Sequence, residues 1–376
     1  MREPDNSGAK PSVIVLGGGV SGLGVALALL RRGHGVTLLE RGEVGAESSW
    51  AGGGILSPLL PWAYSAPVSM LALRSMAIYA GWVAGIEATS GLDAEFWRCG
   101  MLALDVAAPE QALAWCAQHG MAGKRGGPDT LHPAPAARRQ TSVWLPDVAQ
   151  VRNPRLVAAL RAAVVRLGGA IHEHRAATGV RTQGGRVTAV LTGTDTLPAD
   201  RMVLATGAWA GLGLTGLAAV PHIRPIRGQM LLFKLEPGVL DTILYRNGLY
   251  LIPRRDGHVL VGSTLEDAGF DKSTDAATRQ RLHLEAAELL PALGAMQPAR
   301  HWAGLRPGSP DNIPVIDRHP DFDNVFVNTG HYRYGVTLAP ASAELLADVM
   351  EGKTPALDPA PYRWQAALER RWPDGS

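Results

Sequence analysis

The apolar positions near the N-terminus first form a continuous run and then repeat at helical spacing. Residues 13–16 are all apolar, which is typical of a buried parallel strand. A helix is predicted next by apolar residues at spacings of four and three: Leu23, Leu27 and Leu30. Gly33 is placed to end this helix, and residues 35–39 form a second apolar run that leads to the carboxylate of Glu40. The pattern therefore predicts a strand, a helix and a second strand in immediate succession.

Similar patterns predict alternating helices and strands along the rest of the chain. Helices are expected at 67–87, 109–119, 153–167, 274–290 and 336–350. Strands are expected at 96–106, on both sides of Gly184-Gly185, and at 201–205, 229–233, 249–252 and 259–262. We expect Asn153 to be an N-cap with Pro154 at the first helical position, and residues 126–137 to form an exposed loop.

The turn between the first strand and helix carries the motif Gly17-x-Gly19-x-x-Gly22. In a dinucleotide-binding unit the first glycine permits the tight turn and the second lets the backbone approach a pyrophosphate, while the third allows the helix to pack on the strand. The helix N-terminus then offers unpaired N–H groups to the phosphates. Glu40 lies 18 residues after Gly22, where a carboxylate accepts hydrogen bonds from a ribose. The order of these features predicts a dinucleotide site.

A membrane helix or a signal peptide is the alternative for this region, because residues 13–30 carry no charge. Five glycines lie within that run, and a second strand with an acidic residue follows it. Both features favour a dinucleotide-binding unit over membrane insertion.

The composition favours a globular rather than a disordered chain and argues against a protein that binds nucleic acid or anionic lipid. Of the 376 residues, 46% are hydrophobic and 19% charged, and the net charge is +2 from 36 basic and 34 acidic residues. This balance provides no strong field for nucleic acid or anionic lipid. The two cysteines, Cys99 and Cys116, form neither a metal-binding spacing nor a disulfide framework, so we expect no metal site and a cytoplasmic location.

Two further segments have the composition of backbone that passes close to a ligand. Residues 46–56 are too rich in glycine for a helix interior but apolar enough to be buried, and we expect Ser48, Ser49, Gly52 and Gly53 to bind the cofactor. The alternative is a packed loop without a ligand role. The triplet Ala205-Thr206-Gly207 follows an apolar strand and predicts a second backbone turn near the same dinucleotide, although an ordinary strand-to-loop turn has the same sequence pattern.

Two arginines lie in apolar stretches bounded by glycine. Arg306 and Arg333 have few acidic neighbours in sequence, and a guanidinium can hold a carboxylate through two parallel hydrogen bonds. They are therefore candidates for binding a planar anion. The alternative is that each forms a structural ion pair with an acidic residue distant in sequence.

Five stretches occur here in an order that is found in one known family. They are the unit from Gly17 to Glu40, Ala205-Thr206-Gly207, Tyr250-Leu-Ile-Pro253-Arg254, Gly304-Leu-Arg306-Pro307-Gly308 and Gly330-His-Tyr-Arg333. From about residue 12 to about residue 350 the chain resembles the flavin-dependent glycine oxidases of the D-amino-acid-oxidase-like group. The first two stretches are common to many flavoproteins, whereas the last three together are more specific.

This resemblance implies an α/β fold with FAD as the cofactor. A Rossmann-like FAD-binding domain is expected from residues 1–75, 150–215 and 305–376. A second, mostly antiparallel β-sheet domain for the substrate is expected from residues 76–149 and 216–304.

The resemblance also implies roles for individual residues. Arg306 would bind the substrate carboxylate with a supporting hydroxyl from Tyr250, and Arg333 would lie beside the flavin and the substrate. The segment 330–335 would open a helix with its amides toward the flavin. Its expected cofactor-binding residues are Gly330, His331, Tyr332, Tyr334 and Gly335. His331 is either a base or, as we favour, structural, because hydride transfer from a neutral amine needs no strong base.

The implied reaction is oxidative deamination of a small amino acid, with dioxygen as the acceptor and hydrogen peroxide as a product. Glycine is the favoured substrate, with sarcosine and D-alanine as secondary ones, and the implied role is in making the thiazole of thiamine. A homotetramer is possible on the same grounds. The chain departs from the family pattern at Tyr334, which stands in place of a small polar residue. It also departs in segment 59–62, which is bulky and includes Trp62. Both differences leave open how large a substrate the site accepts.

Two other functions remain open at this level. The chain could be a D-amino acid dehydrogenase or an N-substituted amine oxidase that passes electrons to a quinone, or it could be a non-enzymatic flavin-binding sensor. Oxygen consumption without an added acceptor distinguishes an oxidase from an enzyme that uses a quinone. Failure of every amine to bleach the flavin would indicate a non-enzymatic sensor.

Overall fold

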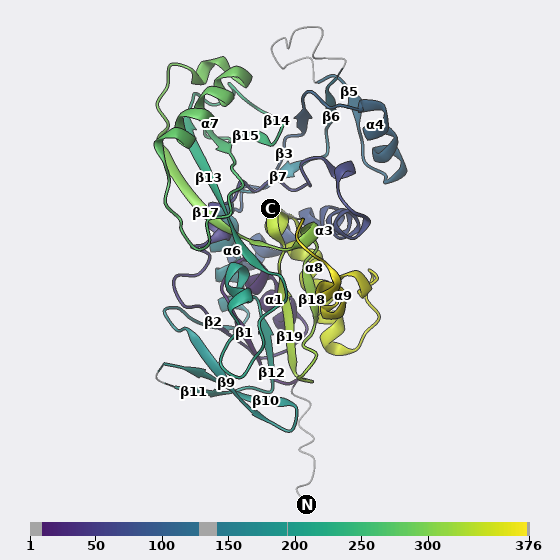
Figure 1. The fold of residues 1–376 in the computed structure, drawn as a ribbon, viewed down its shortest axis with the longest axis vertical. Coiled ribbons are helices and arrows are strands. Elements are labelled where there is room, and N and C mark those ends of the chain that lie inside the picture. The colour runs from purple at the N-terminus through teal and green to yellow at the C-terminus, as the bar shows by residue number, and fades with distance from the viewer. Residues whose placement is uncertain (1–9, 128–140, 194, 374–376) are drawn as a thin grey trace, which may run out of the picture.

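The fold contains two large sheets in different halves of the molecule (Figure 1). The computed structural model describes residues 10–127, 141–193 and 195–373. The first sheet has six strands in the order β18-β19-β12-β1-β2-β8. In that order they are Val315–Arg318, Val325–Thr329, Arg201–Leu204, Val13–Leu16, Val36–Leu39 and Ala170–His172. All neighbouring pairs are parallel except β18 and β19. The predicted strand–helix–strand unit is present at its start.

The strands of this sheet are buried on both faces. Val13 and Val15 of β1 belong to one apolar core, and Ile14 and Leu16 belong to another. Successive side chains of a strand point to opposite faces, so burial on both sides requires a continuous apolar run. The first core is closed by helices α1 (Val20–Arg31), α3 (Ala66–Ser90), α6 (Asn153–Arg166) and α8 (Gly335–Glu351). The second is closed mainly by a three-stranded sheet of β9 (Ala177–Gln183), β10 (Arg186–Thr192) and β11 (Thr196–Pro198).

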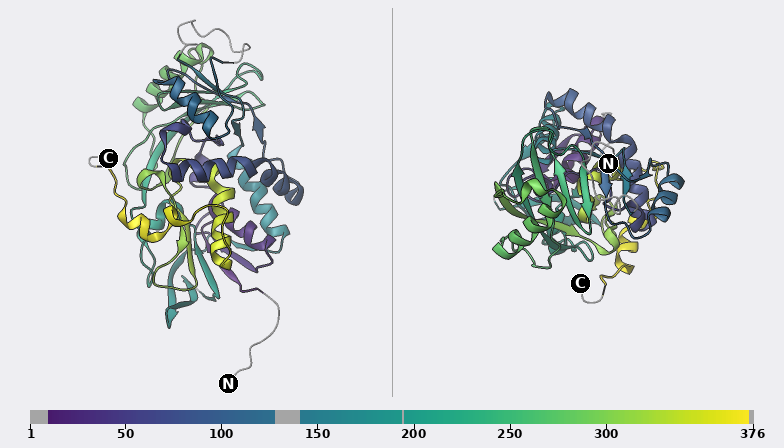
Figure 2. Two further views of the ribbon diagram at one scale, coloured as in Figure 1. Left: turned by 90° about the vertical axis from the view of Figure 1, so that its right-hand side faces the viewer. Right: turned by 90° about the horizontal axis from the view of Figure 1, so that it is seen from above.

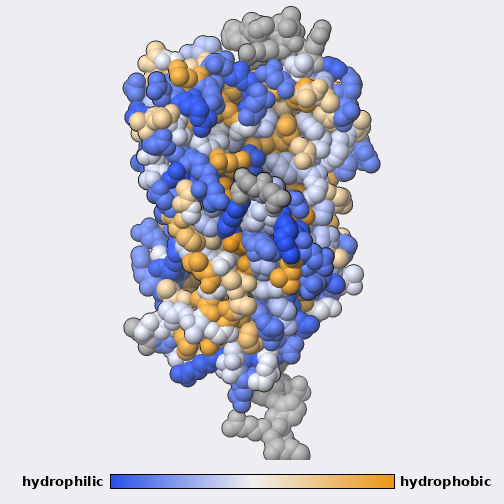
Figure 3. Space-filling model, viewed as in Figure 1, coloured by the Kyte–Doolittle hydropathy of each residue, from blue (hydrophilic) through white to orange (hydrophobic). Residues whose placement is uncertain are grey.

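Helix α3 packs against α6 and α8, and Figure 2 shows it crossing the helical layer. By length and composition it could cross a membrane, although 39% of its most apolar window is buried. Length and composition are a weak criterion, because the core helices of soluble proteins meet them too. Figure 3 shows hydrophilic residues over much of one face, interrupted by smaller hydrophobic patches. The run 13–30, considered above as a membrane helix, is instead divided between β1 and α1.

The second sheet has eight strands in the order β17-β13-β16-β15-β14-β4-β6-β5. In that order they are Arg300–Gly308, Arg224–Lys234, His258–Gly262, Leu249–Pro253, Ile243–Arg246, Met101–Ala103, Val143–Leu145 and Lys124–Arg125. All pairs are antiparallel except β14 with β4. Helix α7 (Ala276–Leu289) packs on one face, and α4 (Pro109–Gln118) contributes to the core on the other. The predicted combination of a parallel, Rossmann-like layer with a mostly antiparallel sheet is confirmed.

Shorter elements complete the described chain. β3 (Trp97–Arg98) pairs with β7 (Ala149–Gln150), and two short helices are α2 (Ser48–Ala51) and α9 (Trp364–Glu369). The 3-10 turns are η1 (Pro61–Ala63), η2 (Gly207–Leu212), η3 (Pro291–Leu293), η4 (Pro310–Asn312), η5 (Tyr332–Tyr334) and η6 (Ala360–Tyr362).

Two local predictions are wrong. The strand expected at 96–106 is split into β3 and β4, because Gly100 adopts φ 70° and a Cβ there would lie 2.0 Å from the Trp144 ring. The N-cap of α6 is Arg152, and Asn153 is already helical. The Asn153 side chain instead donates to the Ser49 carbonyl at 2.9 Å, so it ties α6 to α2 rather than capping its own helix. The loop expected at 126–137 lies mostly outside the described residues.

The division into two domains remains our proposal. The boundary predicted after residue 75 falls within α3, and the one after residue 304 falls within β17. A division that kept whole elements together would therefore move both boundaries.

Candidate active site

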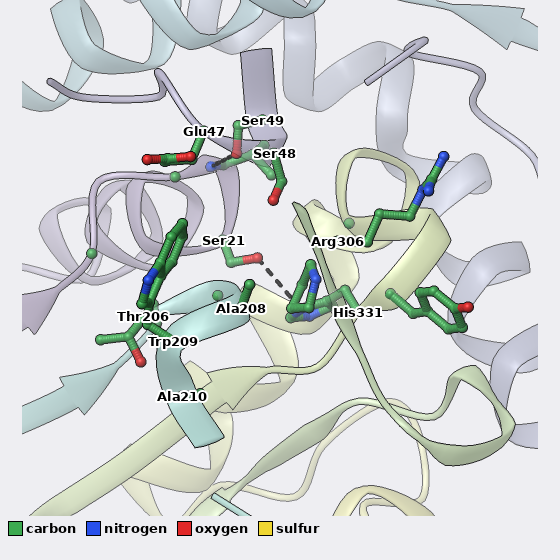
Figure 4. A pocket seen from close by; sticks show the side chains of 18 of the residues that line it. Ser21, Glu47, Ser48, Ser49, Thr206, Ala208, Trp209, Ala210, Arg306 and His331 are labelled. Atoms are coloured by element: carbon green, nitrogen blue, oxygen red, sulfur yellow. Dashed lines mark hydrogen bonds between the residues drawn. The ribbon is translucent and has the colours of Figure 1, made fainter. Parts of the chain in front are cut away.

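A cavity of about 370 Å³ lies between the two sheets. The first half contributes the carboxyl ends of β1, β2 and β12, the segment around α2, and the start of α8. The eight-stranded sheet contributes Tyr250, Ser263, Arg306 and Pro307. In Figure 4 Thr206 and Trp209 lie at one side of the cavity and Arg306 at the other. Ligands of open α/β sheets bind at the carboxyl ends of the strands, so this position is the expected one for a cofactor.

The glycine motif brings three backbone segments unusually close together. Gly17 has φ 105°, and a Cβ there would lie 2.4 Å from the Ala205 carbonyl oxygen. A Cβ at Gly22 would lie 1.9 Å from the Gly17 carbonyl oxygen, so only glycine lets α1 pack so closely on the preceding turn. Gly17 and Gly19 line the cavity, whereas Gly22 is not among its lining residues. The N-terminus of α1 is therefore held at the cavity wall.

Glu40 lies at the end of β2 with its carboxylate fixed by two backbone groups. Oε2 accepts from the Gly18 N–H at 2.7 Å, and Oε1 accepts from the Gly42 N–H at 2.9 Å. The residue lines the cavity beside the glycine motif. A carboxylate has about four lone-pair sites, so acceptor capacity remains for the hydroxyls of a ribose. The glycine cradle and this oriented carboxylate together fit the adenosine diphosphate part of a dinucleotide.

The serines of α2 make contacts within the protein. Ser49 Oγ accepts from the Val20 N–H at 2.9 Å, at the first residue of α1, and the Ser48 hydroxyl donates to the Leu305 carbonyl on β17. Both residues also line the cavity, as do Gly52 and Gly53. A Cβ at Gly53 would lie 2.4 Å from Ile252 Cδ1, so the backbone there packs directly on β15. These contacts fix α2 between α1 and β17.

Thr206 and Gly207 line the cavity at the start of η2, and three residues that we did not predict lie near them. Arg41 lies 3.5 Å over the ring of Trp209 and pairs with Glu47 at 3.2 Å. Two of these three residues could have been identified from the sequence. Arg41 directly follows Glu40, and Trp209 lies two residues after Gly207, so both extend motifs that were already identified.

The segment 330–335 forms a 3-10 turn, η5, before α8 begins at Gly335. Gly330 has φ 78° and is not among the lining residues, whereas His331, Tyr332, Tyr334 and Gly335 are. His331 is 1% exposed, and burial lowers its pKa to about 4, so the imidazole is neutral at pH 7. Its Nδ1 lies 3.4 Å from Ser21 Oγ (Figure 4), and Nε2 has no hydrogen-bond partner among the described residues.

Arg306 extends from β17 into the cavity and is held by neutral groups. Nη1 donates to the Thr264 carbonyl at 3.1 Å, and Nη2 donates to Ser263 Oγ at 2.6 Å. Burial lowers the pKa of this guanidinium. Gly228, on the neighbouring strand β13, provides the space, because a Cβ there would lie 2.1 Å from Nη1. Within the described part of the chain no carboxylate pairs with Arg306, so the alternative of a structural ion pair finds no support.

Arg333 is surrounded by phenol groups. Burial acts to lower the pKa of Arg333, but the neighbouring side chains of Tyr334, Tyr64, Tyr250 and Tyr245 raise it above its ordinary value. Across residues 10–127, 141–193 and 195–373 its side chain makes neither a hydrogen bond nor an ion pair. Two guanidinium groups without acidic partners thus face one end of the cavity. Such an arrangement is suited to a planar anion, because a guanidinium can hold a carboxylate through two parallel hydrogen bonds.

Tyr64 and Tyr245 were not identified from the sequence. Tyr245 lies opposite Tyr250 in the pairing of β14 with β15, and Tyr64 follows η1. Trp62, which we expected near the pocket mouth, packs against the core of the eight-stranded sheet and is not among the cavity-lining residues. Leu59 of the same bulky segment does line the cavity.

The parallel sheet and the glycine cradle are those of an α/β protein that binds a dinucleotide cofactor. Residues 12–349 match the DAO family, described as FAD dependent oxidoreductase, and the chain belongs to this family. The predicted family, enzyme class and cofactor are confirmed.

Known relatives extend this assignment. The chain is 45% identical to the glycine oxidase of Pseudomonas aeruginosa, over 93% of this chain and 97% of that protein. It is 32% identical to the bifunctional protein ThiO/ThiG of Nostoc sp., over 90% of this chain and 52% of that protein. Among solved structures, the glycine oxidase of Geobacillus kaustophilus superposes with a TM-score of 0.87 at 27% identity, covering 94% of this chain and 98% of the other.

Proposed function

We propose that the protein is a glycine oxidase, which converts glycine and D-alanine to an oxoacid, ammonia and hydrogen peroxide, and the secondary amine sarcosine to glyoxylate, methylamine and hydrogen peroxide. The observation that carries the proposal is the pair of half-buried guanidiniums, Arg306 and Arg333, at the end of a cavity whose other end fits a dinucleotide. Similarity to the Pseudomonas aeruginosa glycine oxidase supports it. In the net reaction an amino acid with a primary amine, dioxygen and water give the oxoacid, ammonia and hydrogen peroxide.

The residues toward FAD are assigned from their places around the cavity. Gly17 and Gly19 would border the pyrophosphate, and Glu40 would accept from a ribose hydroxyl. Thr206 and Gly207 would contact the cofactor from the end of β12, and Gly52 and Gly53 from the segment after α2. When bound, FAD supplies a two-electron acceptor for the substrate Cα–H and passes those electrons to dioxygen.

The chain's own part in the chemistry is to bind and orient the substrate. Glycine has no side chain, so its carboxylate must supply most of the orientation. Arg306 would bind that carboxylate, with Tyr250 beside it and Arg333 adding positive charge from the same end. Because the Arg306 guanidinium is already held by Ser263 and Thr264, little side-chain freedom is lost on binding.

His331 would serve as a positioning residue rather than as a base. Its imidazole is neutral and fully buried, and it contacts Ser21 at the start of α1. A neutral amine can release a hydride without a strong base when it is held in the reactive orientation. The substrate amine would therefore lose its proton before it reacts.

The cellular role that we propose is in thiamine thiazole biosynthesis. Similarity to about half the length of a bifunctional ThiO/ThiG protein supports this role. We also propose a cytoplasmic location, from the cysteine usage, and a homotetramer, from the family resemblance.

Replacement of Arg306 tests the function. Removing one partner of a buried charged pair costs about 2–5 kcal/mol, which corresponds to about 30-fold to several-thousand-fold in kcat/KM. We therefore expect Arg306→Ala to lose activity with glycine but to keep its bound flavin, and Arg306→Lys to recover only part of the activity, because an ammonium lacks the planar fork. A simple amine without a carboxylate should be much less affected. Equal losses for glycine and for such an amine would exclude the carboxylate role.

The electron acceptor is tested with the unmodified enzyme. Glycine-dependent oxygen consumption without an added acceptor supports an oxidase, whereas turnover only with a quinone identifies a dehydrogenase. If no amine bleaches the flavin under anaerobic conditions, the protein is not an amine-oxidising enzyme.

A further inference from the structure

Tyr334 and Tyr64 form a rigid pair beside the anion site. Their hydroxyls are hydrogen-bonded to each other, and their rings meet edge to face with centroids 5.1 Å apart at 90°. Tyr334 is 3% exposed and lies in the first apolar core. Tyr64 packs against that core from the segment after η1. The pair therefore links two chain segments that are distant in sequence.

The position of Tyr334 is fixed at both ends of its side chain. Its backbone is the N-cap of α8, directly after Arg333, and its hydroxyl contacts Tyr64 and the backbone of Leu59. Tyr334 and Leu59 both line the cavity, whereas Tyr64 supports the pair from behind. A side chain held in this way cannot turn aside for a larger ligand without breaking these contacts.

The other residues around the end of the cavity that holds the two arginines also leave little room for a substrate side chain. Tyr250 is 8% exposed and lies opposite Tyr245 in the sheet. Gly53 packs so closely that a Cβ would lie 2.4 Å from Ile252 Cδ1 and 3.4 Å from the Tyr250 ring. Rings and closely packed backbone thus bound the volume next to the two arginines.

We propose that the Tyr64–Tyr334 pair is a specificity-determining wall, which limits substrates to amino acids with no side chain or with a single-carbon substituent. The inference rests on the proposed oxidation of small amino acids. A carboxylate held at Arg306 and Arg333 places the substituents of Cα or of the amine in the space that these rings bound. Substrates with a branched or aromatic substituent are then excluded by overlap with Tyr334.

The test compares substrates within each variant, so that a general loss of activity cancels. Tyr334→Ala removes the ring, and Tyr64→Ala removes its support without changing a lining residue. One additional methylene in a pocket changes kcat/KM by about 10- to 200-fold. We therefore expect the kcat/KM ratio of D-leucine to glycine to rise at least about tenfold in both variants. Tyr64→Phe keeps the ring and removes the hydroxyl contact, so it should give a smaller rise.

Tyr362→Ala is the matched control. Tyr362 is 2% exposed and belongs to the same apolar core, but it is not among the cavity-lining residues, and its hydroxyl donates to the Pro67 carbonyl at 2.7 Å. The Tyr362→Ala variant loses a tyrosine ring from the same core without opening the cavity. Its kcat/KM ratio of D-leucine to glycine should therefore stay that of the wild type. Flavin content and melting temperature show which variants are folded.

Binding of simple carboxylates gives a readout that needs no turnover. Acetate and benzoate are titrated against the holoenzyme and followed by the absorbance of the bound flavin. Wild type should bind acetate in preference to benzoate, and Tyr334→Ala and Tyr64→Ala should reverse or reduce that preference. An unchanged preference in both folded variants, together with an unchanged substrate ratio, overturns the proposal. A wild type that binds these carboxylates but oxidises no amino acid instead contradicts the proposed function.

Discussion

Gly228→Ala should lower the activity of the enzyme from a position that does not line the cavity. Gly228 lies on β13 opposite Gly304, two residues before Arg306 on the paired strand. An added Cβ would lie 2.1 Å from Arg306 Nη1 and 2.4 Å from Nη2. The atoms in the way belong to the end of a flexible side chain rather than to the backbone. The sheet should therefore accept the methyl group while the guanidinium moves.

The size of the effect follows from that displacement. Ordinary contact with a Cβ begins at 3.4 Å, so the guanidinium must retreat by more than about 1 Å. A shift of about 1 Å in a positioning group lowers the rate on the order of 100-fold. Complete loss of the charged partner, about 2–5 kcal/mol, sets the upper limit. We expect kcat/KM for glycine to fall between about 30-fold and 300-fold.

The assay is anaerobic reduction of the bound flavin by glycine in a stopped-flow instrument. Gly35→Ala is the control, because a Cβ at Gly35 has no atom within 4 Å and the backbone does not need a positive φ. Both variants should keep their flavin and melt close to the wild-type temperature. If a folded Gly228→Ala protein oxidises glycine with wild-type kinetics, the position of the Arg306 guanidinium beside Gly228 does not matter for catalysis, and the prediction is refuted.

Two further predictions concern the cofactor and the response to acid. Glu40→Gln should weaken FAD binding by about 1.5–3 kcal/mol, because it removes one charge-assisted hydrogen bond. Titration of the apoprotein with FAD measures this loss of affinity, and turnover at saturating FAD should stay near normal. For His331 the folded pKa of about 4 lies below the unfolded value of 6.5, so the unfolded chain binds more protons as the pH falls through this window. His331 should therefore contribute roughly 3 kcal/mol to the stability that wild type loses between pH 6.5 and 4, so the loss measured by urea unfolding should be smaller in His331→Asn. Parallel pH profiles would contradict the assignment.

The parallel layer could be predicted from sequence because its signals are local. The apolar run of β1, the spacing of α1 and the acid after β2 lie within 30 residues and depend on no distant partner. Gly100 shows the limit of such signals. The residues around it are apolar enough for one long strand, and only the ring of Trp144, brought close by the pairing of β4 with β6, requires the break.

The sequence predicted the cavity residues that stand out in their local stretch, but not the residues that hold them in position. Arg306 is notable in sequence because it is a charge in an apolar stretch. Ser263 and Thr264, which hold it, come from another strand end and carry no signal of their own. Tyr245 is placed by its register with Tyr250, which a single sequence does not reveal. Ser49 was expected to bind a ligand, and its hydroxyl accepts from the first N–H of α1.

The attachment of α2 to β17 joins the two ends of the cavity, so we expect binding at one end to affect binding at the other. Ser48 donates to Leu305, next to Arg306, and the Trp302 indole N–H donates to the Ala51 carbonyl at 3.1 Å. The same short helix borders the cofactor end of the cavity, while the strand carries the anion-binding side chain. A ligand that favours one arrangement of this joint changes the affinity for the other ligand, and the effect is equal in both directions. We therefore expect the affinity for the cofactor to change when a carboxylate is bound at the proposed anion site.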